Sequence, residues 1–207
     1  MDTNIKYVII TPVRDEEQYI EKTISSVTSQ TLKPVEWIIV NDGSVDNTGS
    51  IIDKYATEYS WIKTVHRSNR GFRKAGGGVI EAFYAGYNVV EFKDWDFIVK
   101  LDGDLSFETW YFEKCFQHFD KDSKIGGLIN APGWDTVDEV KANMLGWETK
   151  SFSDLQILHL RYTGGAEGTW RDMVKHGRAN YIAGYHPLFM LLKCTKRMFQ
   201  KPFLLDQ

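Results

Sequence analysis

Short apolar runs alternate with amphipathic segments along the N-terminal part of the chain, and this alternation limits the possible folds more than any other feature. Four runs rich in β-branched and aromatic residues have the composition of strands: Tyr7–Val13, Glu36–Val40, Ile62–Val65 and Phe97–Leu101. Helical spacing of apolar residues follows each run, at Ile20–Val27, Ile51–Tyr59, Val79–Glu91 and Phe112–Phe119. We expect Asp15 to cap the first of these helices. Strands and helices that alternate with short connections predict an α/β fold, in which a mostly parallel sheet carries helices on both faces.

Composition excludes several classes of protein. The net charge of −3 argues against a general nucleic-acid binder, and the 43% of apolar residues is enough for a full core. Two cysteines without metal-ligand spacing suggest a reducing compartment. The sequence shows no signal peptide and no apolar run near the roughly 18 residues of a membrane span. We therefore expect a cytoplasmic protein, with the inner face of the membrane as a possible location.

Polar clusters follow three of the four predicted strands. They lie at Pro12–Glu16, Asn41–Ser44 and Asp102–Asp104. In open parallel sheets, ligands bind outside the carboxyl ends of the strands. The three clusters are therefore expected to meet at one edge of the sheet and to form a ligand site there.

The sequence Asp102-Gly103-Asp104 is the strongest candidate for a cation site. Two carboxylates at the end of a core strand suit Mg²⁺ or Mn²⁺, which usually takes one or two carboxylates and completes its shell with water and phosphate oxygens. Gly103 allows the chain to turn, so that each carboxylate can be aimed separately. The alternative is a simple turn, since Asp-Gly is a strong turn signal. Two other nucleotide signatures, the G-x-x-x-x-G-K-[ST] loop and G-x-G-x-x-G after the first strand, are not found in the sequence.

Taken together, the clusters resemble the motifs of the family-two glycosyltransferases, which have the GT-A fold. The matching segments are Thr11–Glu17 (family P-x-x-N-E-E, with Asp15 in place of Asn), Val40–Ser44 with Asp46 (V-D-D-G-S-x-D), Asn69–Gly71 with Ala75 (N-x-G-x-x-x-A), Asp102–Asp104 (D-x-D), and Gly133–Asp138 with Gly146 and His159. The resemblance covers about residues 7–159. It implies a nucleotide-sugar-binding GT-A catalytic domain over residues 1–160, followed by a basic, mainly helical extension over 161–207.

The resemblance also implies a site. The nucleotide would be bound by Pro12, Val13, Arg14, Glu16, Asp42, Ser44, Gly71, Arg73, Lys74, Asp102 and Gly103. The metal, Mg²⁺ or Mn²⁺, would be held principally by Asp104, with Asp102 and His159 as further ligands. A solvated loop is the alternative for Arg73 and Lys74, and a helix-dipole role is the alternative for Glu16.

The general base is expected at Asp135, which lies 24 residues before His159, as the second acid of the family's E-D pair precedes its His. Trp134 replaces the first acid of that pair, so the motif is half present. Asp138 is the alternative base, and Asp135 could instead cap a helix. The chain also departs from the family in having only residues 120–132 where several dozen are usual.

The expected function is an inverting, metal-assisted transfer of a sugar from a nucleotide-diphosphate donor, most simply a UDP-sugar, to a hydroxyl of a saccharide or lipid-linked acceptor, as in polysaccharide biosynthesis. The alternatives are a non-catalytic nucleotide-sugar or glycan-binding module and, less favoured, a nucleotidyltransferase. From Arg161 onward, eight basic and three acidic residues give a local charge of +5. Residues 185–201 are therefore either a solvated helix face or a basic segment that touches an anionic membrane surface.

Overall fold

The structure, a computed structural model, describes residues 5–71, 77–122, 125–128, 144–161 and 186–198. The chain divides into two compact units, residues 1–161 and 162–207. The first contains every described strand and four of the described helices, and in the second only one helix, α7, is described. The candidate site lies in the first unit.

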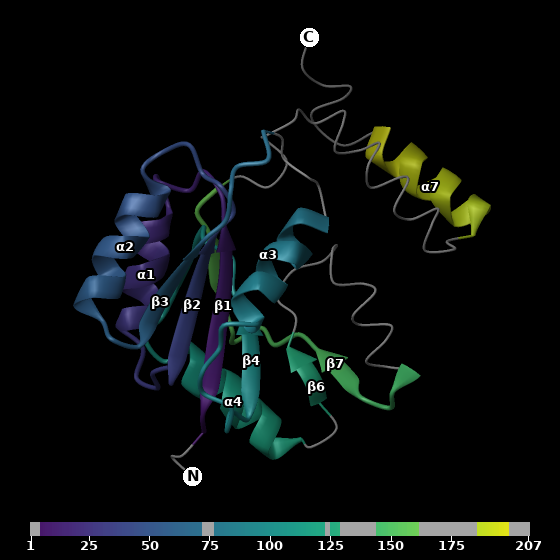
Figure 1. Ribbon diagram of the computed structural model, residues 1–207. Coiled ribbons are helices and arrows are strands. Elements are labelled where there is room, and N and C mark those ends of the chain that lie inside the picture. Colours follow the sequence, from purple (N-terminus) through teal and green to yellow (C-terminus); the bar gives the residue numbers. More distant parts are fainter. Residues whose placement is uncertain (1–4, 72–76, 123–124, 129–143, 162–185, 199–207) are drawn as a thin grey trace. The chain divides into compact units, whose positions relative to one another are not determined.

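The centre of the first unit is a parallel four-stranded sheet with the strand order β3-β2-β1-β4 (Figure 1). Its strands are β1 (Tyr7–Val13), β2 (Glu36–Asn41), β3 (Ile62–His66) and β4 (Phe97–Lys100). β1 pairs with β2 on one side, where Val13 is opposite Asn41, and with β4 on the other, where Tyr7 is opposite Phe97. The four predicted strands and their parallel arrangement are thus confirmed.

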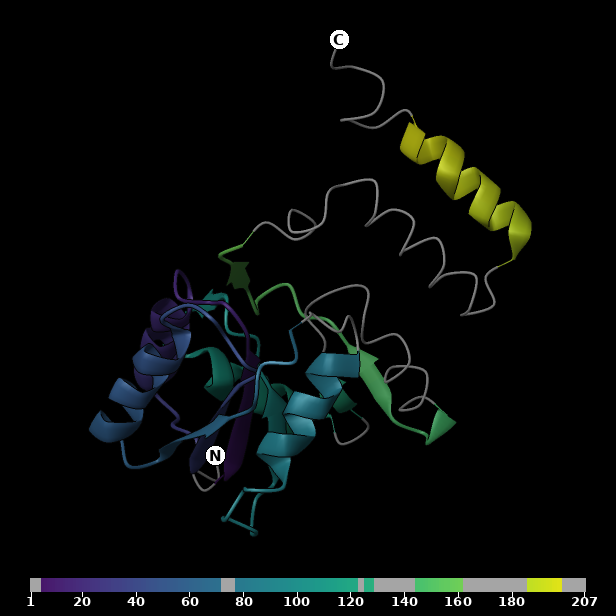
Figure 2. The same ribbon diagram turned by 45° about the horizontal axis from the view of Figure 1, so that its top comes forward.

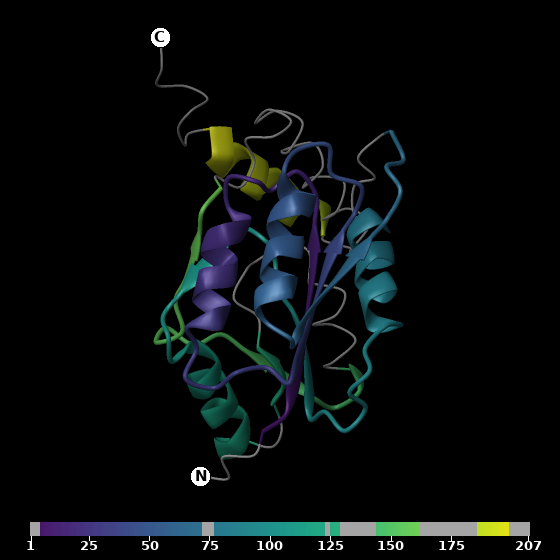
Figure 3. The same ribbon diagram turned by 60° about the vertical axis from the view of Figure 1, so that its left-hand side comes forward.

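Alternate residues of the central strands enter two different cores. Tyr7, Ile9, Trp37 and Ile39 face one side and Val8, Ile10, Ile38 and Val40 the other, and all eight are fully buried. Because side chains alternate across a strand, near-continuous apolar runs are needed when helices cover both faces. Helices α1 (Ile20–Thr28), α2 (Thr48–Glu58) and α4 (Tyr111–Lys121) contribute to the first core, and α3 (Gly77–Tyr87) to the second. Figures 1 and 3 show α1 and α2 on one side of the sheet and α3 on the other.

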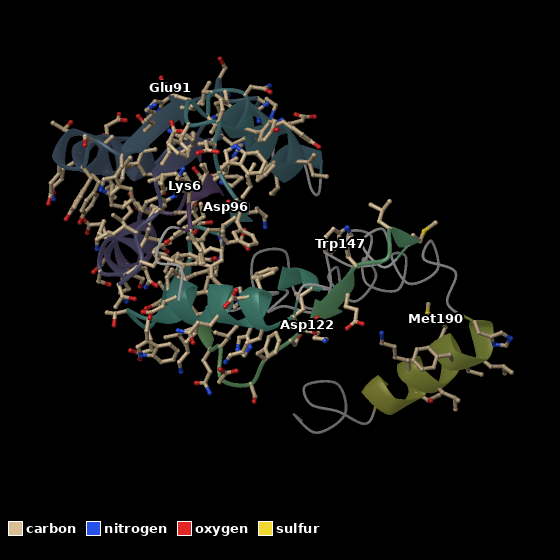
Figure 4. All side chains as sticks on the ribbon, turned by 90° about the horizontal axis from the view of Figure 1, so that it is seen from below. Lys6, Glu91, Asp96, Asp122, Trp147 and Met190 are labelled. Atoms are coloured by element: carbon tan, nitrogen blue, oxygen red, sulfur yellow. The ribbon has the colours of Figure 1, made fainter. Side chains whose placement is uncertain are left out.

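Two sequence predictions need correction. The fourth strand was expected to be buried, but Phe97, Ile98 and Val99 are only partly buried, because β4 is an edge strand of the described sheet. The third helix was expected to end at Glu91, whereas α3 ends at Tyr87. At the start of β4, the Lys6 backbone N–H donates to Asp96 Oδ2 at 2.8 Å, and Figure 4 shows these two residues side by side.

Smaller elements complete the description. β5 (Leu105–Phe107) pairs antiparallel with β8 (Ile157–His159). β6 (Ile125–Leu128) pairs parallel with β7 (Glu148–Lys150) (Figure 1). In the second unit, α7 (Pro187–Met198) exposes Leu188, Leu191 and Leu192. Among the described residues, no helix is long and apolar enough to cross a membrane.

Candidate active site

The strand order reverses between β1 and β4. From β1 the chain proceeds to β2 and β3 on one side, and then crosses to β4 on the other. In such a sheet the ligand crevice lies outside the carboxyl ends of the strands at this reversal. The loops after β1, β2 and β4 lie at that edge, which is uppermost in Figure 1 and turned forward in Figure 2. They carry the three polar clusters that the sequence predicts to meet.

The loops after β1 and β2 are joined through Asp15. Its backbone N–H donates to Ser44 Oγ at 3.0 Å, and its Oδ1 accepts from the Val45 N–H at 2.9 Å. Asp15 has a φ of 54°, in the left-handed region that Asp and Asn adopt more readily than most residues. The prediction that Asp15 caps the following helix is therefore wrong. Helix α1 begins only at Ile20, and the Asp15 carboxylate accepts its hydrogen bond from the loop after β2.

Asp46 and Thr48 reinforce this junction. Asp46 Oδ2 accepts from the Glu17 N–H at 3.1 Å, and Thr48 Oγ1 accepts from the Glu16 N–H at 2.8 Å. Burial alone would raise the pKa of Asp46, but hydrogen bonds from Thr48 and from the Glu17 backbone outweigh it and lower that pKa. Asp46 and Thr48 thus join the two loops and fix the backbones of Glu17 and Glu16, respectively.

Two arginines hold Asp42. Arg67 Nη1 donates to Asp42 Oδ1 at 2.6 Å and Arg70 Nη2 to Oδ2 at 2.5 Å, while Arg70 Nη1 also donates to Glu81 of α3 at 2.5 Å. The side chain of Asp42 is 10% exposed. A nearly buried carboxylate needs such partners, because its desolvation would otherwise be costly. Asp42 therefore lies within an ionic cluster formed by β2, the segment after β3, and α3.

Gly43 allows the segment after β3 to lie close to the loop after β2. It has a φ of 73°, and a Cβ at this position would lie 2.5 Å from Asn69 Cα. Asn69 Oδ1 in turn accepts from Arg14 Nη2 at 3.1 Å and from the Gly71 N–H at 2.8 Å. Glycine is required here both for the backbone conformation and for the close approach. Three predicted nucleotide-binding residues, Arg14, Ser44 and Gly71, thus belong to one connected group of loops.

The loop after β4 is fixed by α1. Thr23 Oγ1 donates to the carbonyl oxygens of Gly103 and Leu105, at 2.8 Å each, and accepts from the Leu105 N–H at 3.0 Å. A Cβ on Gly103 would lie 2.6 Å from Val13 Cγ1, so glycine is needed where this loop packs against β1. The two carboxylates that flank Gly103 have different surroundings.

Asp102 is half-exposed and accepts from Lys100 Nζ at 2.8 Å, whereas the side chain of Asp104 is 11% exposed. Asp104 Oδ2 accepts from Arg161 Nε at 3.2 Å. The same guanidinium reaches the β1 loop, where Nη2 donates to Glu16 Oε1 at 2.6 Å. Arg161 therefore joins the carboxyl ends of β1 and β4 through one cation.

The pKa of Arg161 reflects this position. Burial alone would lower it, but the carboxylates of Glu16 and Asp104 outweigh burial and raise it. Arg161 lies two residues after His159, the exposed last residue of β8, which is opposite Leu105 in the β5–β8 pair. The predicted metal residues Asp102 and Asp104 thus lie in the loop between β4 and β5, and His159 ends β8, the strand that pairs with β5.

The donor set fits a hard divalent cation of the kind that binds together with a phosphate. Glu16 and Asp104 are nearly buried carboxylates that one guanidinium nitrogen can reach at once, and oxygen ligands suit Mg²⁺ or Mn²⁺. The described part of the chain contains no group of three or more metal-binding side chains. An all-protein cage is therefore not formed there, and a cation would need water or ligand oxygens to complete its shell.

Some predicted site residues lie outside the described residues: Arg73, Lys74, Asp135 and Asp138. Four residues of the site are not predicted from the sequence: Thr23, Arg67, Arg70 and Arg161. Arg70 lies within the Asn69–Gly71 motif and Arg67 two residues before it, so the cations at this motif were the available signal. Nothing local marks Arg161, which is 145 positions from its partner Glu16.

A solved structure identifies the fold. The mannosyltransferase PcManGT from Pyrobaculum calidifontis, solved with GDP-Man and Mn²⁺, aligns with 98% of this chain and 83% of its own, with a TM-score of 0.59 and 13% sequence identity. The chain thus has the GT-A fold, as predicted.

The sequence then gives the family. Residues 8–178 match the family model for glycosyl transferase family 2, and the chain belongs to that family. It is 33% identical over 179 residues to the poly-beta-1,6-N-acetyl-D-glucosamine synthase of Staphylococcus aureus, covering 84% of this chain and 37% of the synthase. It is 24% identical over 203 residues to the uncharacterized glycosyltransferase YibD of Escherichia coli, covering 90% of this chain and 54% of YibD. The chain therefore spans about half or less of the length of these curated relatives.

Proposed function

We propose that the chain carries the donor-binding and catalytic part of an inverting, metal-assisted glycosyltransferase that uses a nucleoside-diphosphate sugar. The observation that carries the proposal is the position of Glu16, Asp42 and Asp104. These three nearly buried carboxylates lie at the carboxyl ends of adjacent parallel strands, where a sheet of this topology binds ligands, in a chain of glycosyl transferase family 2.

Asp42 is proposed to read the nucleobase. Each of its oxygens accepts from one arginine, and a carboxylate has about four lone-pair sites, so it can still accept the N–H of a base. Arg67 and Arg70 fix the orientation of the Asp42 carboxylate. Pro12, Val13, Arg14, Ser44 and Gly71 are proposed to border this pocket, with Arg73 and Lys74 supplying charge to the diphosphate.

Asp104 is proposed as the principal ligand of Mg²⁺ or Mn²⁺, with Asp102, Glu16 and His159 beside it. A bound divalent cation would stabilise the negative charge that develops on the leaving diphosphate. Gly103 and Thr23 fix the backbone between the two aspartates, so that the orientation of Asp104 is set before a ligand binds.

Asp135 is proposed as the general base, with Asp138 as the alternative. The acceptor hydroxyl oxygen forms a bond to the anomeric carbon while the bond from that carbon to the diphosphate oxygen breaks on the opposite face. The hydroxyl proton passes to the carboxylate. One glycosidic bond forms as one glycosyl phosphate bond breaks, with inversion at the anomeric carbon.

The acceptor is proposed to be a saccharide or a lipid-linked saccharide, since the synthase among the relatives is named for a polysaccharide. Contact with an anionic membrane surface through residues 185–201 would suit a lipid-linked acceptor. In support, α7 exposes Leu188, Leu191 and Leu192, and the sequence of the same segment contains the basic residues Lys193, Lys196 and Arg197.

The proposal is tested by nucleotide release. The full chain is incubated with UDP- and GDP-sugars, with Mn²⁺ or with a chelator, and Asp104→Asn serves as the matched variant. We expect release from one nucleotide class, most simply UDP, that depends on Mn²⁺ and is lost in the variant. Nucleotide binding without release would instead identify a non-catalytic binding module, and no binding to either class would refute the proposal.

A further inference from the structure

One guanidinium joins two carboxylates that belong to different strands of the sheet. Arg161 Nη2 is 2.6 Å from Glu16 Oε1 and 3.2 Å from Asp104 Oδ2, and Nε adds a second contact to Asp104 at 3.2 Å. The side chains of Glu16 and Asp104 are 6% and 11% exposed, while that of Arg161 is 32% exposed. The carboxylates are therefore fixed, and the cation is the more solvent-accessible member of the group.

Backbone pairing places Arg161 at this position. His159 is opposite Leu105 in the antiparallel β5–β8 pair, and the Leu160 N–H donates to the Asp104 carbonyl at 2.8 Å. The side chain of the next residue, Arg161, then reaches the carboxylate of Asp104 itself. The contact is thus set by the sheet ladder and not by a chance surface pairing of two long side chains.

The charges of these three side chains do not cancel among themselves. Two nearly buried carboxylates share one guanidinium, at the edge where the metal and the diphosphate are proposed to bind. A buried carboxylate is costly to leave without a cation. A guanidinium fits carboxylates and phosphates equally well, because its planar donors match the oxygen spacing of both.

We propose that Arg161 is a positioning residue that takes the place of the divalent cation on Glu16 and Asp104 while the donor is absent, and moves to the donor diphosphate when metal and donor bind. This proposal rests on the proposed function of the same site. A divalent cation on Asp104 repels a guanidinium at the same oxygen, and an incoming diphosphate offers that guanidinium new acceptors. Arg161 therefore opposes metal binding before the donor arrives and supports the metal–donor complex afterwards.

Loss of Arg161 should therefore change the affinity for free Mn²⁺ and the affinity for nucleotide in opposite directions. Both affinities can be measured without turnover. In Arg161→Gln, we expect Mn²⁺ alone to bind more tightly than in the wild type, on the order of tenfold, because a competing charge is removed. We expect UDP or GDP, whichever the wild type binds, to bind about tenfold more weakly in the presence of Mn²⁺, because a charge-assisted contact is lost. Titration calorimetry of the full chain measures both affinities.

Two further variants make the result specific. Lys63→Gln removes one positive charge from β3, where Lys63 pairs with Glu36 and Glu91, and should leave both affinities as in the wild type. Arg161→Lys keeps the charge without the planar fork and should lie between the wild type and Arg161→Gln. If Arg161→Gln does not fold, as judged by circular dichroism, Arg161→Lys alone must still bind free Mn²⁺ more tightly than the wild type.

The proposal is overturned if removal of Arg161 leaves the affinity for free Mn²⁺ unchanged or weaker, or if neither protein binds Mn²⁺ at all. A purely structural role for Arg161 would weaken both affinities together. The proposed function has a separate readout, because nucleotide release by the wild type does not depend on any Arg161 variant. Release with unchanged Mn²⁺ affinities would refute only the role of Arg161, whereas no nucleotide binding by the wild type would refute the function.

Discussion

Substitution of Asp42 by asparagine tests the ionic cluster at the end of β2 and the proposed base pocket in one variant. The asparagine side chain would keep a similar shape and one acceptor oxygen, but its amide nitrogen cannot accept a hydrogen bond. One of the two arginine contacts, at 2.6 Å from Arg67 or 2.5 Å from Arg70, must therefore be lost. The remaining contact is no longer between full charges.

The loss of one arginine contact sets the expected change in stability. A hydrogen bond to a charged group contributes about 1.5–3 kcal/mol, and the cluster is buried enough for this range to apply, since Asp42 is 10% exposed and the arginines are 22–24% exposed. We expect Asp42→Asn to lower the free energy of unfolding by this amount. For a chain of this size the loss corresponds to roughly 3–12 °C in Tm.

Nucleotide affinity should fall independently. If Asp42 accepts the N–H of the base, its loss costs a charge-assisted bond of similar size, which is about a 10- to 150-fold change in Kd. Urea unfolding measures the stability and titration calorimetry with UDP and GDP measures the affinity. Both are measured on the folded variant below its unfolding transition.

Glu81→Gln is the matched control. Glu81 contacts the same arginines but is 42% exposed, so its ion pairs should contribute at most about 1 kcal/mol and its loss should leave base affinity unchanged. Wild-type stability in Asp42→Asn would refute the energetic reasoning about the cluster. Wild-type nucleotide affinity in the same variant would refute the role of Asp42 in reading the base.

Four further predictions concern other parts of the chain. Burial alone would raise the pKa of Glu36, but hydrogen bonds from a lysine and from two backbone N–H groups outweigh burial, and the net effect is a lowered pKa. The Glu36 carboxylate therefore stabilises the fold at pH values above its unfolded pKa, and this stabilisation is lost as the pH falls through the lower folded pKa. Urea unfolding should show Glu36→Gln to be less stable than the wild type at pH 7, and the difference should disappear in acid. Gly43→Ala should lower Tm and nucleotide affinity together, because a Cβ would lie 2.5 Å from a neighbouring backbone carbon, and wild-type values for both would contradict this. Asp135→Asn should reduce turnover by about 10² to 10⁴ with donor affinity unchanged, and if it does not while Asp138→Asn does, the base is the second residue. The full chain should sediment with anionic vesicles at low salt and be released at high salt. Leu191→Glu on α7 should abolish this sedimentation, and persistent binding of the variant would show that the apolar face of α7 is not responsible.

The sequence by itself determined the elements and the edge of the sheet at which the site is formed. Apolar runs such as Tyr7–Val13 and Glu36–Val40 are local signals, and their alternation with helices requires parallel strands whose carboxyl ends meet. Asp42, Asp102 and Asp104 could be placed at that edge because each lies within a few residues of the carboxyl end of a strand. The end of α3 and the partial burial of β4 were missed, because both depend on which neighbours cover them.

Only the tertiary structure decided which charges meet. Arg161 contacts Glu16 across 145 positions, and Arg67 and Arg70 reach Asp42 across 25 and 28. No local pattern encodes such pairs, since they depend on strand order and on the β5–β8 register. Asp15 shows the same limit: its sequence position suits a helix cap, but the left-handed backbone directs its carboxylate to the β2 loop. The periodicity of apolar residues determines whether a segment forms a helix or a strand, whereas long-range packing determines which charged side chains pair with each other.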